Sequence, residues 1–385
     1  MALVGLLGLT ACGSSSDQEK PGPDGDASPC DVPIQTAPWD LFVEFCEATD
    51  AGHPPTRKQL RAFAELPMMV AWRNSMGQPV PAGDIINWLE FTFTPEDLRP
   101  KNTPSRDRVA FRRSYNYSIE HRRAIQTRLA EFRTEGLACR VRDEAAFWLK
   151  PEQRPTALEI VFMPSKPELR ISKGRLFVDT GVLWAGSREQ LVGQLMSLVF
   201  REEGLLQGPP AASLEGEAAV AHSVRSMMNQ GILGYIENLP GTRFRADHPK
   251  LGDLAIIPEN VFQTGVKTID LLNRFIPLEG EDPQAVQTRG YDLAMTLKAS
   301  SSINQGGYCM AACIATNLSR ERLRDCVGNP SAFLRSYQEA ALQNPSPQPS
   351  PHTVPDALPS SMPPLDEAVI KDLLRICDQV FADTE

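Results

Sequence analysis

The chain has 385 residues, of which 42% are apolar and 23% are charged, and its formal net charge is −9 at pH 7. These proportions are typical of globular proteins rather than of disordered ones. The excess of negative charge argues against a general nucleic-acid binder and against electrostatic docking on anionic lipid. Basic residues do cluster between Arg99 and Arg142, but they alternate with apolar residues at helical spacing, which indicates a solvated helix face.

The first motif lies at the N-terminus. The apolar run Ala2–Leu9 leads into Leu9-Thr10-Ala11-Cys12, and the polar stretch Gly13–Asp17 follows. This pattern resembles a bacterial lipoprotein signal, in which a peptidase cuts before the cysteine and the cysteine is then acylated. The run has the length of a signal peptide and is too short to cross a bilayer as a helix. The resemblance implies a signal peptide at residues 1–11, lipidation of Cys12 and a protein anchored in the membrane of a bacterial cell envelope.

Two details qualify this signal. No Lys or Arg precedes Lys20, so the usual basic region is missing, and we expect the true start codon to lie upstream of Met1. The residue after Cys12 is Gly13 rather than Asp, so we expect the outer membrane if the host has one. The alternative is a cytosolic protein with an apolar N-terminus.

After Cys12 the chain alternates between polar and apolar segments. Residues 12–38 are rich in Gly, Ser, Asp and Pro, which predicts a flexible tether. We expect packed structure over 39–343, with helices over 57–76 and 107–136 and strands over 156–163 and 175–180. The apolar spacing predicts further helices at 189–206, 215–238, 258–275, 283–300, 307–317, 319–325 and 330–343.

A helix start signal at Asp282 and two segments at the end of the chain complete the expected fold. Asp282 followed by Pro283 is a helix start signal, since the aspartate can cap and proline suits the first turn. Residues 344–364 are dominated by Pro and Ser and predict an extended linker, and 365–385 predict a last helix. The expected fold class is α+β and mainly α, a helical domain with a small sheet.

Eight cysteines are present, and seven remain if Cys12 is lipidated. An exported chain can form disulfide bonds. The sequence allows a Cys30–Cys46 bond and two bonds among Cys309, Cys313, Cys326 and Cys377, with the connectivity left open. Cys309 and Cys313 lie four residues apart on a predicted helix, but with no CxxC pair and no nearby histidine we expect no zinc site there.

The segment 156–238 carries a second resemblance. The strand that ends at Asp179-Thr180-Gly181-Val182-Leu183 leads into an apolar helix, which in turn precedes the helical stretch Met228–Glu237. This order resembles zinc metallopeptidases of the gluzincin type, in which a TGLL-like turn precedes the H-E-x-x-H helix and a later helix reads N-E-G-x-A-x-Y. Residues 196–200 read Met-Ser-Leu-Val-Phe where H-E-x-x-H is expected, and Gln230 stands where the later helix has its glutamate.

Zinc hydrolysis needs two imidazoles at positions i and i+4, a general base between them and a third ligand. The resemblance therefore implies a metallopeptidase outline in which the ligands and the base are replaced by Met196, Ser197, Phe200 and Gln230. We expect no catalytic residue, no metal and no cofactor in this domain. The cleft could instead bind a peptide or protein partner in a binding or scaffolding role.

Three alternatives stay open. The first is an unrelated helical domain in which the apolar side chains of the 189–206 helix are simply a core face, namely Leu191, Leu195, Met196, Leu198, Val199 and Phe200. The second is an active zinc hydrolase with unusual ligands, His222 together with Glu202, Glu203 or Glu237. The third is a purely structural envelope lipoprotein. Motifs for serine hydrolases and for nucleotide binding are absent from the sequence.

Overall fold

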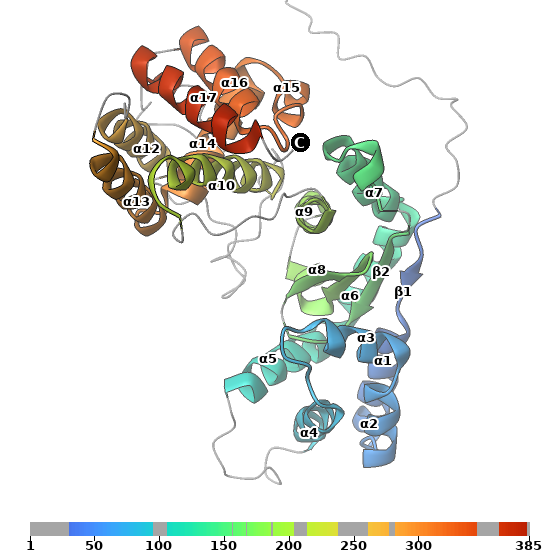
Figure 1. The fold of residues 1–385 in the computed structure, drawn as a ribbon. Helices are drawn as coiled ribbons and strands as arrows, with labels where there is room; N and C mark the ends of the chain where they lie inside the picture. Colours follow the sequence, from blue (N-terminus) through green and yellow to red (C-terminus); the bar gives the residue numbers. More distant parts are fainter. Residues whose placement is uncertain are drawn as a thin grey trace, which may run out of the picture. The chain divides into compact units, whose positions relative to one another are not determined.

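The computed structural model describes residues 31–94, 106–155, 157–166, 168–185, 188–203, 214–237, 261–276, 282–344 and 362–382. The expected signal peptide, Cys12, most of the expected tether and most of the 344–364 segment lie outside the described residues. Described residues are mostly helical with one four-stranded sheet, so the α+β, mainly α fold class is confirmed (Figure 1).

Seven helices before the second strand form the first part of the described chain. They are α1 (Ala37–Asp50), α2 (Arg57–Ala64), α3 (Pro67–Ser75), α4 (Ala82–Phe93), α5 (Arg106–Glu120), α6 (Arg122–Thr134) and α7 (Leu137–Trp148). A short 3₁₀ turn, η2 (Pro151–Gln153), follows α7. Several large aromatic side chains of this part are almost completely buried, namely Trp39, Phe42, Phe63, Trp72, Tyr115 and Trp148.

The predicted long helices are each broken once. The 57–76 segment divides into α2 and α3 because Pro67 lacks an N–H and pushes Leu66 into an extended conformation, so a new helix begins there. The 107–136 segment divides into α5 and α6 at His121, whose backbone leaves the helical range. Apolar spacing alone runs through both breaks, and so the sequence indicated one helix in each case.

The sheet has the order β1-β2-β4-β3, with β1 (Ile34–Gln35), β2 (Glu159–Met163), β3 (Leu169–Ser172) and β4 (Arg175–Asp179). β1, β2 and β4 are parallel, and β3 runs antiparallel to β4. The β3–β4 hairpin turns at Lys173 and Gly174, both with positive φ, as two-residue hairpin turns require. The two predicted strands correspond to β2 and β4, so their carboxyl ends lie side by side.

Helices make up the rest of the described chain. They are α8 (Thr180–Ala185), α9 (Arg188–Glu203), α10 (Gly216–Glu237), α12 (Val261–Phe275), α13 (Pro283–Ala299), α14 (Gly307–Asn317), α15 (Arg320–Arg324), α16 (Pro330–Gln343) and α17 (Glu367–Phe381). A π-helical turn, η4 (Ser302–Gly306), precedes α14. Asp282 caps α13 as expected, because its side chain accepts the amide N–H groups of Gln284 and Ala285.

Helix α10 is the central element of this second set of helices. It contacts α9, α13, α14, α16 and α17 (Figure 1). Thirteen of its 22 residues are buried, and they are distributed around the helix rather than along one stripe. A buried surface that takes up most of the circumference of α10 needs neighbouring helices on several sides. The position of α10 is therefore set by several packed helices at once.

Glycines allow the closest of these contacts. A Cβ added to Gly231 on α10 would lie 2.3 Å from the carbonyl oxygen of Gly307 on α14, and one added to Gly307 would lie 2.2 Å from the carbonyl oxygen of Met227. Both distances are far inside van der Waals contact with backbone atoms. Only glycine on both helices lets α10 and α14 approach this closely.

The described cysteines correct the disulfide expectation. Cys46, Cys309, Cys313, Cys326 and Cys377 are all buried free thiols, so neither the Cys30–Cys46 bond nor the two bonds within the C-terminal four are formed. Cys139 is disulfide-bonded, and its partner lies outside the described residues. The sequence allowed the wrong pairs because the four C-terminal cysteines point into a packed helical core, where burial rather than pairing protects them.

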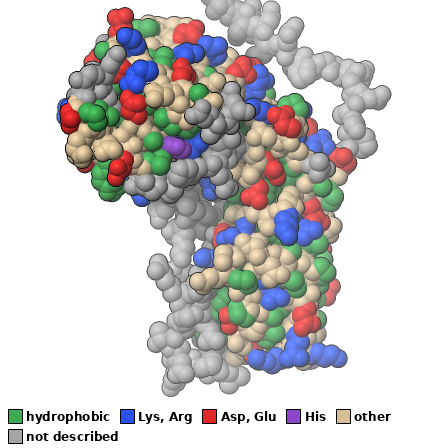
Figure 2. All heavy atoms as spheres, in the orientation of Figure 1, with side chains coloured by type: hydrophobic (Ala, Val, Ile, Leu, Met, Phe, Trp, Pro, Cys, Tyr) green, Lys and Arg blue, Asp and Glu red, His purple; other side chains and the backbone are tan. Residues whose placement is uncertain are grey.

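On the face drawn in Figure 2, acidic and basic side chains are interspersed over the described surface. Many of them form surface ion pairs, such as Arg322 with Glu339. Among the described helices, none is long and apolar enough to cross a membrane.

The α10–α14 crossing yields a stability prediction. Gly231→Ala should lower the free energy of unfolding by about 1–3 kcal/mol, because the new methyl group must push the α14 backbone away. Gly83→Ala on α4 is the matched control, since a Cβ there meets nothing within 4 Å and should be neutral or slightly stabilising. Urea unfolding followed by far-UV circular dichroism measures both, and equal stability of the two variants would contradict the close crossing.

Candidate functional site

Within the 156–238 segment that the sequence compares with metallopeptidases, β4 ends at Asp179, which leads directly into α8. Asp179 is only 1% exposed. One of its carboxyl oxygens, Oδ1, accepts the backbone N–H groups of Gly181 at 2.9 Å and Val182 at 3.3 Å. These are N–H groups of the first turn of α8, which have no partner within the helix. Asp179 thus fixes where the strand ends and the helix begins.

The other carboxyl oxygen of Asp179 joins neighbouring elements. Its Oδ2 accepts the backbone N–H of Ser165, after β2, at 2.7 Å and the hydroxyl of Ser114, on α5, at 3.0 Å. Ser118 of α5 and Thr180 of α8 lie beside this cluster with their hydroxyl oxygens 3.1 Å apart. The turn into the α8–α9 segment is therefore tied to both the sheet and α5.

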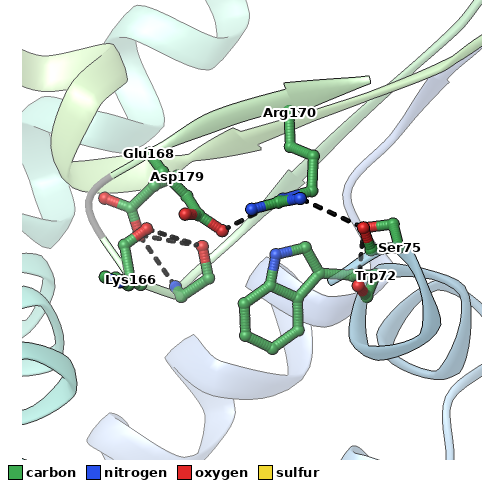
Figure 3. Close-up of polar contacts among 7 residues, drawn as sticks. Trp72, Ser75, Lys166, Glu168, Arg170 and Asp179 are labelled. Atoms are coloured by element: carbon green, nitrogen blue, oxygen red, sulfur yellow. Dashed lines mark hydrogen bonds and ion pairs between the residues drawn. The ribbon is translucent and has the colours of Figure 1, made fainter. Parts of the chain in front are cut away.

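The surroundings of Asp179 are shown in Figure 3. Arg170 extends from β3 and donates to the carboxylate of Glu168 and, at 3.0 Å, to the carbonyl oxygen of Ser75 at the end of α3. Burial raises the pKa of Asp179 to about 7, while the hydrogen bonds from Ser165, Ser114 and the α8 amides act in the opposite direction. The guanidinium of Arg170 pairs with Glu168 rather than with Asp179, so the buried carboxyl is held by hydrogen bonds.

Helix α9 contains residues 196–200, which the sequence resemblance compares with H-E-x-x-H. Met196 is 1% exposed and Phe200 is fully buried, and both belong to the hydrophobic core. The other residues expected on a core face, Leu191, Leu195 and Val199, are buried as well, whereas Leu198 is only partly buried. The core-face interpretation of this helix is confirmed for all of these except Leu198.

The ring of Phe200 lies in an aromatic cluster around Trp148 of α7. The centroid of Trp148 is 6.5 Å from that of Phe200 and 6.1 Å from that of Tyr235 on α10, both with edge-on geometry. The guanidinium of Arg320, on α15, lies 5.3 Å from the Trp148 ring and also pairs with Glu144 of α7. Phe200, which the resemblance compares with the second histidine, is thus one ring of a packed cluster.

Ser197, which stands where the motif has its general base, faces α10. Its hydroxyl contacts the carbonyl oxygen of Gln194 at 2.9 Å and the Oε1 of Glu237 at 3.1 Å. The Nη2 of Arg201, one turn further along α9, lies 3.4 Å from the same Oε1. Burial raises the pKa of Glu237, while Arg201 and Ser197 act to lower it. This hydroxyl, carboxylate and guanidinium form the polar contact between α9 and α10.

Gln230, which stands at the third ligand position of the motif, is exposed on α10. The α10 residue that the structure brings to Ser197 is Glu237, seven positions later and therefore on nearly the same face, roughly 10 Å further along the helix. The sequence singled out Glu237 only as a partner for His222. Its seven-residue spacing from Gln230 is the signal that could have indicated the shared face.

His222 is not brought near the acidic residues proposed as its co-ligands. It lies 15 positions before Glu237 on the same helix, a separation of roughly 22 Å. Glu202 and Glu203 follow Arg201 at the Glu237 end of α10. The Nδ1 of His222 instead lies 2.6 Å from the Nη2 of Arg225, and burial and this guanidinium lower the pKa of His222.

The donor set near α9 and α10 does not fit a zinc ion. A thioether, a hydroxyl and a phenyl ring stand at the motif positions of α9, and none of these is the imidazole or carboxylate that catalytic zinc uses. Among the described residues, no group of three or more His, Cys, Asp or Glu side chains is arranged to hold a metal ion. Of the four motif positions, the structure places Met196, Ser197 and Phe200 at the α9 packing surface and leaves Gln230 outside it.

Comparison with known families also indicates a metallopeptidase-like domain, but the match lies in a different part of the chain. Residues 259–346 match the model of a family described as "Putative zinc dependent peptidase (DUF5700)". This stretch contains α12 to α16, covers less than a quarter of the chain and does not overlap residues 156–238. No curated protein and no solved structure matches the chain. The match supports a metallopeptidase-like domain, and the matched stretch contains no histidine.

Asp179 yields a prediction on pH dependence. Its pKa of about 7 in the folded protein lies above the ordinary value of 3.8, so the folded state binds this proton more tightly than the unfolded chain does. The resulting stabilisation is fully present below the unfolded pKa and is lost as the pH rises through about 7. The shift corresponds to about 4 kcal/mol at most.

Between about pH 5 and pH 8, the free energy of unfolding of the wild type should fall as Asp179 loses its proton. The Asp179→Asn variant lacks this titration, so its free energy of unfolding should fall less over the same range. Urea unfolding at the two pH values measures the difference, which is independent of the fixed cost of the substitution. Asp143→Asn, which changes an exposed carboxylate paired with Arg142, is the control and should keep the wild-type pH dependence. An unchanged pH dependence in Asp179→Asn would show that this carboxyl does not titrate in the range.

Proposed function

We propose that the protein is a lipid-anchored component of the bacterial cell envelope whose metallopeptidase-like domain has no zinc-peptidase activity and serves in binding or scaffolding. The observation that carries the proposal is the burial of Met196 and Phe200, at the motif positions of the two histidine ligands. The family match supports the metallopeptidase-like part of the proposal.

Burial of these two side chains opposes zinc chemistry on physical grounds. A catalytic zinc site needs an open coordination position for water, and its ligands need a second shell of hydrogen-bond partners. Phe200 packs against the Trp148 ring, and Met196 lies in the same core. Burial of an apolar side chain contributes roughly 1.5–3 kcal/mol to folding, so both residues now stabilise the domain.

The anchor rests on the lipobox-like residues Leu9–Cys12. The disulfide bond of Cys139 adds support, because such bonds persist in oxidising compartments such as the bacterial periplasm. The five buried thiols are compatible with that compartment, since burial shields them from oxidants. Two acyl chains at Cys12 would hold the domain at the membrane without help from its charge.

Metal analysis tests the catalytic part of the proposal. After chelator treatment, zinc reloading and removal of loosely bound metal, the purified chain should retain no stoichiometric zinc, since its motif positions offer no ligand set. His222→Ala should leave the zinc content unchanged, because His222 lies far from Glu237. Tightly bound zinc that is lost in His222→Ala would instead establish the alternative, an active hydrolase with unusual ligands.

A fatty-acid probe in a bacterial host tests the anchor. Cys12→Ser should abolish labelling and release the protein from the membrane fraction, because the acylated atom is the cysteine sulfur. Ser16→Ala, a change in the polar stretch after Cys12 that touches no cysteine, is the control and should remain labelled and membrane-bound. Labelling that persists in Cys12→Ser would overturn the lipoprotein assignment and leave the domain proposal standing.

A further inference from the structure

Three sulfur-bearing side chains lie close together in the helical core, away from the α9–α10 contact. Cys309 and Cys313 are four residues apart on α14, so they share one face of that helix, and both are fully buried. Met362, which precedes α17, is fully buried as well. Neither cysteine is in a disulfide bond. The cluster thus combines two thiols with one thioether.

Gly265 of α12 brings the thioether and one thiol together. A Cβ added to Gly265 would lie 2.8 Å from the Sγ of Cys309 and 3.0 Å from the Cε of Met362. Both sulfur-bearing side chains therefore fill the space that a side chain on α12 would take. The second thiol also lies close to Met362, because the backbone N–H of Met362 hydrogen-bonds Cys313.

Nitrogen donors point at both thiols. The Sγ of Cys313 accepts a hydrogen bond from the Nδ2 of Asn317 at 3.4 Å and a second one from the backbone N–H of Met362. Cys309 accepts the backbone N–H of Gly265 and donates its own proton to the carbonyl oxygen of Val261 at 3.4 Å. N–H groups directed at sulfur are the outer-shell contacts that stabilise metal-bound thiolates.

We propose that Cys309, Cys313 and Met362 form a binding site for a soft monovalent metal ion, Cu(I). Thiolate and thioether ligands without nitrogen or oxygen select soft ions, and the set lacks the four ligands of a structural zinc site. On binding, each thiol releases its proton to solvent and forms a Cu–S bond, while Met362 donates a lone pair. The ion enters as Cu(I), so no electron is transferred. The resulting charge of −1 faces the N–H donors of Gly265, Met362 and Asn317.

The thiols hold their protons until a metal displaces them. Burial raises the pKa of Cys309 to about 12 and that of Cys313 to about 11. Metal binding should therefore weaken as the pH falls, because protons compete for the same sulfur atoms.

Met362 lies at the start of the short segment that precedes α17. Residues 362–366 are not helical, and hydrogen bonds to α16 hold them in place. The hydroxyl of Tyr337 donates to the carbonyl oxygen of Pro363, and the side chain of Gln338 pairs with both backbone groups of Leu365 at 2.9 and 3.0 Å. A short irregular segment of this kind can open locally without unfolding the helices.

Anaerobic titration of the full chain with Cu(I), in competition with a coloured Cu(I) chelator, tests the site. The wild type should bind one more equivalent of Cu(I) per chain than the double variant Cys309→Ser/Cys313→Ser. Cys326→Ser is the matched control, because Cys326 is a buried thiol that contacts Ser336 and the carbonyl oxygen of Arg322. It should keep the wild-type uptake. Equal uptake by the wild type and the double variant would overturn the proposal.

Met362→Leu keeps the size of the side chain and removes its sulfur. It should weaken Cu(I) binding about tenfold and leave the thermal midpoint of the metal-free protein nearly unchanged. This variant keeps the proposal falsifiable even if the double cysteine variant fails to fold, since unchanged affinity in folded Met362→Leu would overturn the three-sulfur site. Because the cluster does not involve α9, these outcomes are independent of the zinc analysis.

Discussion

The backbone contact between α10 and α14 is the constraint on which the second half of the structure depends. Gly231 and Gly307 leave no room for a side chain between the two helices, and a further glycine contact joins α10 to α13, where a Cβ on Gly290 would lie 2.2 Å from the carbonyl oxygen of Gly216. Helix α10 is thus fixed by rigid backbone on two neighbours. Side-chain packing elsewhere can adjust by rotamer changes, but contacts between backbones cannot.

A fixed α10 determines what α9 can do. The end of α10 carries Glu237, which receives Ser197, and Tyr235, which shares the Trp148 cluster with Phe200. The contact of Ser197 with Glu237 and the aromatic cluster around Trp148 both help to hold α9 on α10, together with apolar packing in the shared core. In such an arrangement the motif positions belong to the packing between the two helices. The apolar residues at these positions stabilise the domain, whereas histidines there would bring imidazoles into an apolar core that offers them few partners.

The sequence predicted those parts of the fold in which the local signals agree. The bounds of α14 and α16 and the Asp282 cap follow from apolar spacing, proline and capping residues, and all were confirmed. Helix α4 was missed because Ile85–Phe93 is rich in β-branched and aromatic residues, so its apolar run does not distinguish a helix from a strand. The burial of Met196 and Phe200 could be predicted from the apolar face of α9. The contact between Glu237 and Ser197 was not predicted. The spacing from Gln230 indicates a shared face of α10, but buried residues occupy most of the helix circumference, so the pattern does not show which face meets α9.

The family match and the α9 motif concern different properties of the domain. The match covers residues 259–346, which include four glycines at close contacts, namely Gly265, Gly290, Gly306 and Gly307. These residues set how α12, α13 and α14 pack around each other and around α10. The matched stretch is thus part of the scaffold that positions α10, and it does not include α9. Chemistry has to be judged from the residues that face one another, and on α9 and α10 these are a hydroxyl, a carboxylate and a guanidinium beside an aromatic core.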